Sequence, residues 1–76
     1  MSHINTDIKI SGYWVRLPRE TRVKEERTFT DFMEAIENGL LILKKDRCDF
    51  VEVIELIDSN SGYYERVFRV RARINN

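Results

Sequence analysis

The sequence predicts a small α+β domain in which one helix packs on one face of a small antiparallel sheet, with the elements in the order β-β-α-β-β. Three observations support this prediction. Apolar residues recur at helical spacing in the middle of the chain, strands rich in β-branched residues flank that segment, and the C-terminal strand alternates apolar and basic residues. We therefore expect a single domain over residues 1–76, with residues 1–6 flexible and residues 75–76 frayed.

The first β-β unit is expected in the N-terminal third of the chain. Residues 8–17 begin as an alternating strand, and the alternation breaks at Gly12, which predicts a bulge or a twist there. Pro18 ends this strand and begins a turn. Residues 22–29 are rich in charge, which is typical of an exposed edge strand that resists aggregation.

The helix is expected to begin at Thr30 and Asp31, because the hydroxyl of Thr30 can cap free backbone amides and the early carboxylate of Asp31 favours the positive end of the helix dipole. It should continue to about Lys45, where lysines complement the negative end of the helix dipole. Gly39 indicates either close packing on the sheet or an early end of the helix. The apolar stripe that should face the sheet contains Phe32, Ala35, Ile36, Gly39, Leu40 and Leu43.

The last two strands are expected to form a hairpin whose register follows from side-chain parity. Residues 59–62 contain Asn and Gly, which tolerate positive φ, and therefore form the loop. This loop places Val53 opposite Phe68, whereas a slip by one residue would set apolar side chains against arginines. Two cross-strand pairs of opposite charge follow from this register: Glu52 with Arg69, and Glu55 with Arg66.

The two faces of the expected sheet differ in what can cover them, because one helix covers only one face. The covered face is expected to hold Val51, Val53, Ile57, Tyr64, Phe68, Val70 and Ala72. The opposite face keeps clustered apolar side chains, which usually mark a partner site, and a homodimer that packs two such faces together is the simplest way to cover them. The expected partner-binding residues are Phe50, Ile54, Leu56, Tyr63, Val67, Arg69 and Arg71.

The C-terminal strand also supports an alternative function, which is RNA or single-stranded nucleic-acid binding. Its arginines recur at every second residue, so they project from one face about 7 Å apart, close to the phosphate spacing of a single strand. Thirteen basic and thirteen acidic side chains give a net charge of zero, which weakens this alternative. The candidate nucleic-acid contacts are Arg16, Arg69, Arg71 and Arg73.

No constellation of residues predicts catalysis, a cofactor or a metal site. His3 is the only histidine and lies near the terminus, and Cys48 has neither a second cysteine nor a well-placed histidine as partner. The carboxylates from Asp46 to Asp58 recur at three-residue steps, which alternate between strand faces and so cannot converge on one ion. We therefore expect a non-enzymatic protein that uses no cofactor and no metal.

No apolar run approaches the roughly 18 residues of a membrane helix, and the first residues lack the apolar core of a signal sequence, so we expect a cytoplasmic protein without a membrane role. The chain resembles the small accessory proteins that tailed phages and other mobile elements encode to modulate host or defence proteins. It shares with them its size, its dense mixed charge and its order of strand, helix and hairpin. This resemblance implies inhibition or modulation of another protein, in the host cytoplasm if the chain is viral. It transfers no functional position to this sequence.

Overall fold

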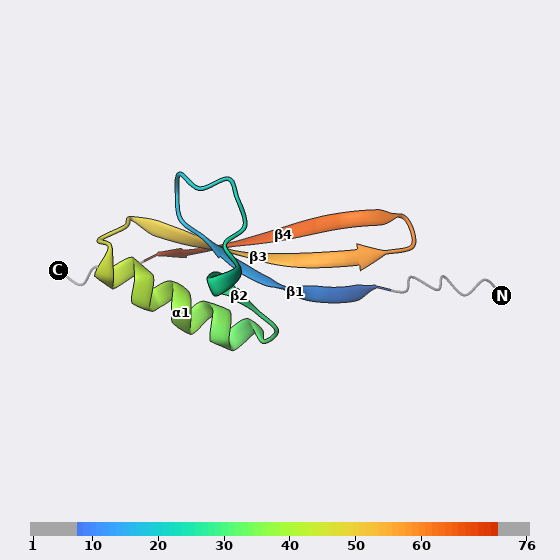
Figure 1. The fold of residues 1–76 in the computed structure, drawn as a ribbon, viewed down its shortest axis with the longest axis horizontal. Coiled ribbons are helices and arrows are strands. Elements are labelled where there is room, and N and C mark those ends of the chain that lie inside the picture. Colours follow the sequence, from blue (N-terminus) through green and yellow to red (C-terminus); the bar gives the residue numbers. More distant parts are fainter. Residues whose placement is uncertain (1–7, 72–76) are drawn as a thin grey trace.

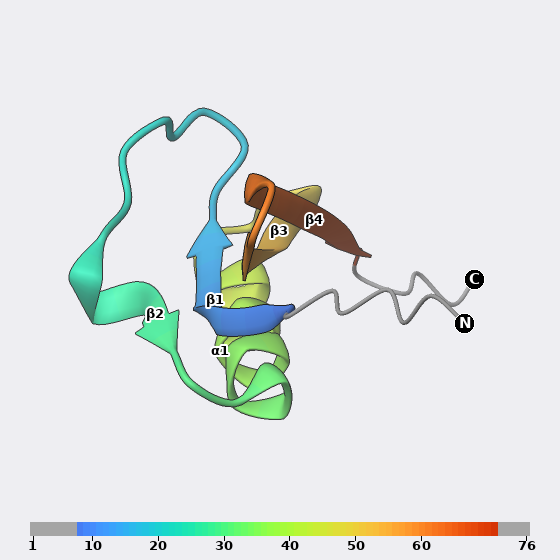
Figure 2. The same ribbon diagram turned by 90° about the vertical axis from the view of Figure 1, so that its right-hand side faces the viewer.

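The computed structural model describes residues 8–71 and consists of a four-stranded antiparallel sheet with one helix on one face (Figure 1). The strand order is β2-β1-β3-β4, so that β2 and β4 form the two edges of the sheet (Figure 2). The predicted α+β class and the order of elements are confirmed. The expectations for residues 1–6, Ala72, Arg73 and residues 75–76 lie outside the described residues. The elements are β1 (Lys9–Arg16), the short 3-10 helix η1 (Glu25–Arg27), β2 (Thr28–Phe29), α1 (Phe32–Lys45), β3 (Phe50–Ser59) and β4 (Gly62–Arg71).

The predicted irregularity in β1 is a β-bulge at Gly12. The pairing of β1 with β3 shifts register between Ile10 and Gly12, and Gly12 has a φ of +154°, which side chains rarely tolerate. A Cβ atom at this position would lie 3.2 Å from the backbone oxygen of Phe29 on β2. Glycine therefore allows β1 to bend while β2 approaches it closely.

The predicted edge strand over residues 22–29 was too long, because β2 contains only Thr28 and Phe29. The chain before it folds around one carboxylate. Arg27 donates hydrogen bonds to both carboxylate oxygens of Glu20, at 2.7 and 2.5 Å, and the backbone N–H of Leu17 donates a third at 3.1 Å. These side-chain bonds and the turn of η1 replace the backbone ladder that a longer strand would have made.

Helix α1 begins at the predicted place and packs through a narrower stripe than the sequence indicated. The cap, however, is Asp31 and not the expected Thr30 hydroxyl: the Asp31 carboxylate accepts a hydrogen bond of 3.2 Å from the backbone N–H of Glu34. The buried positions follow four-residue steps at Ala35, Gly39 and Leu43. Leu40 was expected in this stripe, but it is 38 % exposed, because a helix turns each next residue about 100° away from the buried line.

The predicted hairpin register is confirmed. Ser59 lies opposite Gly62 and Val53 lies opposite Phe68, and the ladder continues without a break. Both predicted charge pairs form, with 3.5 Å between Arg69 Nη2 and Glu52 Oε2, and 3.6 Å between Arg66 Nε and Glu55 Oε1. Side-chain parity excluded a slip by one residue, and the short loop between Ser59 and Gly62 fixed the rest of the register.

The helix covers only part of the length of the sheet, so the predicted covered face was too long. Tyr64 is 50 % exposed and Ile57 is only half-buried. A helix of 14 residues spans about 21 Å, whereas strands of 10 residues span about 33 Å, and the hairpin therefore extends past the start of α1 (Figure 1). The core formed under α1 consists of Tyr13, Val15, Ala35, Leu43, Val51 and Val53, with Phe29, Phe32, Ile36, Ile42, Cys48, Phe68 and Val70 packed around it.

Candidate interaction surface

The sheet face opposite α1, here called the open face, is shared by three strands. Its members follow from the pairing of β3 with β1 on one side and with β4 on the other, because directly paired residues point to the same face. The residues of the open face are Lys9, Gly12, Trp14, Arg16, Phe50, Glu52, Ile54, Leu56, Asp58, Tyr63, Glu65, Val67, Arg69 and Arg71.

The middle of the open face is already covered by the chain itself. Trp14 is 3 % exposed and its cross-strand partner Ile54 is 0 % exposed, although neither belongs to the core under α1. Ile54 was expected to contact a partner, and this expectation was wrong, because no surface of Ile54 is accessible. Sequence reasoning missed Trp14 as the neighbouring large apolar group, since its face depends on the bulge at Gly12 and on the pairing of β1 with β3.

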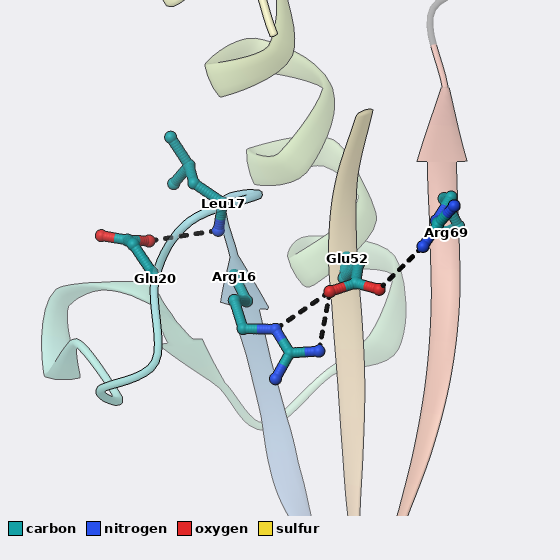
Figure 3. A network of polar contacts seen from close by, with 5 residues as sticks. All are labelled: Arg16, Leu17, Glu20, Glu52 and Arg69. Carbon is teal, nitrogen blue, oxygen red and sulfur yellow. Dashed lines mark hydrogen bonds and ion pairs between the residues drawn. The ribbon is translucent and has the colours of Figure 1, made fainter. Parts of the chain in front are cut away.

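A polar network crosses the open face from β1 to β4 (Figure 3). Arg16 donates to Glu52 Oε1 from Nε at 3.0 Å and from Nη2 at 2.7 Å, and Arg69 approaches Oε2 of the same carboxylate at 3.5 Å. Glu52 is well buried, with 12 % of its side chain exposed. One carboxylate therefore serves two guanidinium groups, and the three-residue network keeps a single positive charge.

Both arginines of this network also lie over aromatic rings. The guanidinium carbon of Arg69 lies 4.2 Å from the ring centre of Phe50, and that of Arg16 lies 5.6 Å from the ring centre of Trp14. Such cation–π contacts fix the arginine side chains against the sheet. These two arginines of the open face are therefore preorganised against the sheet instead of extended into solvent.

The accessible part of the open face lies toward β4. Tyr63 is 77 % exposed, Val67 is 45 % exposed, and Leu56 is half-buried beside them on β3. Arg71 is exposed and has no ion-pair partner within residues 8–71. The sequence-predicted residues are thus brought together on one surface, except for the buried Ile54 and for Arg73, which lies outside the described residues.

A second apolar surface was not expected from the sequence. It lies on the helix side of the sheet, beyond the start of α1, where Ile8 is 60 % and Ile10 is 48 % exposed. Ile8, Ile57 and Tyr64 line a hollow of about 500 Å³ there. This surface exists because the hairpin is longer than the helix, which no local pattern in the sequence reveals.

Two titratable side chains of the fold, Tyr13 and Cys48, have raised pKa values because of their surroundings. Burial raises the pKa of Tyr13, and the adjacent Glu55 carboxylate raises it further. Burial also raises the pKa of the Cys48 thiol, with Asp46 and Asp49 acting in the same direction, so the thiol is held in its less nucleophilic form.

Within residues 8–71, no group of three or more His, Cys, Asp or Glu side chains is placed to hold a metal ion. No helix in the same residues has the length and apolar character needed to cross a membrane. Comparison of the chain with protein-family models, with characterised proteins and with solved structures found no significant match.

Proposed function

We propose that this chain is a small non-enzymatic protein that binds another protein through the β4 side of its open face and thereby modulates or inhibits that protein. The observation that carries the proposal is the grouping of exposed Tyr63 and Val67 with Arg69, whose guanidinium group lies on Phe50. Aromatic and arginine side chains are the residues enriched at the energetic centres of protein interfaces.

The electrostatic setting of the surface supports a protein partner over a nucleic acid. Arg16 and Arg69 share the carboxylate of Glu52, so the network offers one net positive charge to a phosphate backbone instead of two. The net charge of the whole chain is zero. Nucleic-acid binding through Arg71, together with the arginines already named, is the weaker alternative. We also propose a phage or mobile-element origin, on the basis of the chain's size, its dense mixed charge and its order of elements.

The test is capture of a partner by the immobilised chain from a lysate of the organism that encodes it, with and without nuclease. Leu56→Glu places a charge in the half-buried middle of the open face, whereas Leu41→Glu makes the same change on the outer side of α1, where Leu41 is 66 % exposed. We expect the unaltered chain and Leu41→Glu to retain the same nuclease-resistant protein, and Leu56→Glu to retain at least about tenfold less of it, because a buried charge costs binding energy.

Two results would count against the proposal. Equal capture by Leu56→Glu would show that the partner does not contact the open face. Loss of all capture after nuclease treatment would favour the nucleic-acid alternative. That alternative further requires that binding of a fluorescent single-stranded RNA fall steeply as the salt concentration rises, and that Arg71→Ala weaken it.

A further inference from the structure

Within residues 8–71, the outer edge of β4 has no partner strand. β4 ends the strand order β2-β1-β3-β4, and residues 62–67 are all exposed (Figure 2). All 10 of its residues pair with β3 in a ladder without a register shift, so β4 is a regular strand. Backbone N–H and C=O groups on the free side of such a strand are a template for another strand.

The two edges of this sheet differ in how they are protected. β2 has only 2 residues, which is one of the usual ways of blunting an edge. β4 lacks three of the other usual devices, since it contains no proline, no lysine and no bulge in its pairing with β3. Its only charged residues are Glu65, Arg66, Arg69 and Arg71.

We propose that a second copy of this chain pairs antiparallel with this edge, with Val67 of one copy opposite Val67 of the other on the twofold axis. The two sheets then form one continuous sheet, and the two open faces become one surface. This goes beyond the proposed function, and it replaces the face-to-face homodimer that the sequence suggested with an edge-to-edge one.

The charges of β4 are self-complementary in this register. On the open face, Glu65 lies opposite Arg69 of the second copy and Tyr63 lies opposite Arg71, and the symmetry forms each pair twice. On the helix side, Arg66 lies opposite Phe68 of the second copy. Each arginine of the described strand thus meets a carboxylate or an aromatic ring, and cross-strand pairs of these kinds stabilise sheets.

Neighbouring registers are less favourable. An axis at Arg66 or at Arg69 would place two guanidinium groups directly opposite each other, and an axis at Glu65 would do the same with two carboxylates. An axis at Phe68 would set Arg69 against Val67 and would bring together two rings that already pack on their own Phe32, with 5.1 Å between ring centres. Glu65, moreover, has no ion-pair partner within residues 8–71, so the second copy supplies one.

Sedimentation equilibrium over a range of concentrations tests the association. We expect the mass to rise from 9.1 kDa toward twice that value. Glu65→Arg should weaken the dimer at least about tenfold, because two attractive pairs become repulsive. Glu37→Arg, the same change on the exposed side of α1, should have no effect. A monomer at every concentration, or equal weakening by both variants, would overturn the proposal.

The register has its own tests. Combining Glu65→Arg with Arg69→Glu exchanges the two charges and should restore association, provided circular dichroism shows a folded chain despite the neighbouring Glu52. In a Cys48→Ser background, Val67→Cys should form an intermolecular disulfide on oxidation, whereas Glu65→Cys should not, because its own copies lie too far apart. Cross-linking that is absent at position 67, or equal at both positions, would refute this register.

The dimer and the proposed function can fail separately. Leu56 lies on β3, one strand away from the free edge. Its cross-strand neighbour is Glu65, so the uncharged variant Leu56→Gln separates the two proposals. Leu56→Gln should weaken partner capture and leave the sedimentation behaviour unchanged, whereas Glu65→Arg should change the sedimentation behaviour.

Discussion

At the residue scale, Glu20 holds the loop between β1 and β2 together by accepting hydrogen bonds from Arg27 and from the backbone of Leu17. Its pKa is lowered, mainly by the hydrogen bonds from Arg27 and further by the backbone N–H of Leu17, although burial opposes this effect. Three-quarters of its side chain is shielded, since 25 % is exposed, and 13 % of the Arg27 side chain is exposed. The ionised carboxylate therefore holds the loop to the end of β1.

The lowered pKa has a defined consequence for stability. A carboxyl group with a lower pKa in the folded state stabilises the protein above the unfolded pKa, and this stabilisation is lost as the pH falls through the folded pKa. Glu20→Gln should thus lower the free energy of unfolding by about 1–2 kcal/mol at neutral pH, as for a lost hydrogen bond to a charge. The difference from the unaltered chain should shrink below about pH 4.

Urea unfolding at a series of pH values measures this difference. Glu25→Gln is the control, because Glu25 is exposed and its side chain has no ion pair within the described residues. A loss of stability in Glu20→Gln that stays constant down to low pH would show that the charge of Glu20 is not what stabilises the loop.

At the element scale, Gly39 determines how closely α1 approaches β3. A Cβ atom at this position would lie 3.1 Å from Val51 Cγ2, closer than ordinary van der Waals contact. Val51 is 0 % exposed and β-branched, so it has little room to move away. The sequence left open whether Gly39 ends the helix or packs on the sheet, and the helix continues to Lys45. Close packing is therefore its role.

Gly39→Ala should consequently destabilise the protein by about 1 kcal/mol, although alanine is favoured over glycine by about the same amount in a free helix. In a Val51→Ala background the same substitution should become neutral or stabilising, because the obstructing methyl group is gone. A double-mutant cycle in urea gives the coupling free energy between the two positions. A coupling near zero would mean that the helix shifts freely to accept the new methyl group.

At the scale of the whole molecule, the mismatch in length between helix and hairpin divides the sheet into two parts. The part under α1 contains Val51 and Val53, both 0 % exposed, whereas the far part contains the half-buried Ile57 and the 50 % exposed Tyr64. The far part has less apolar contact to hold its backbone hydrogen bonds closed. Local opening should therefore begin at the hairpin tip.

Amide hydrogen exchange along β3 measures this difference. We expect the amides of Val51 and Val53 to exchange at least about tenfold more slowly than those of Ile57 and Asp58, at a protein concentration low enough to keep the chain monomeric. All four amides lie in the central strand β3, so the exchange rates at its two ends can be compared directly. Uniform protection along β3 would indicate that the hairpin opens as one unit.

The candidate surface was predictable in part. Parity along β3 and β4 was enough to place Phe50, Leu56 and Val67 on one face with Arg69, because neighbouring side chains on a strand alternate strictly. Parity could not reveal that Trp14 lies opposite Ile54, so the burial of Ile54 was missed. That contact depends on which strand lies beside β3, and no residue within β3 specifies its neighbour.

The sequence by itself determined the α+β class, the start of the helix at Thr30 and Asp31, the irregularity at Gly12 and the register of the hairpin. These features depend on interactions between residues that are near in sequence or are joined by a short loop. Only the tertiary structure decided the strand order, the shortness of β2, the uncovered hairpin tip and the free edge of β4. Those features depend on how far one element reaches over another, which is a matter of lengths and packing in space.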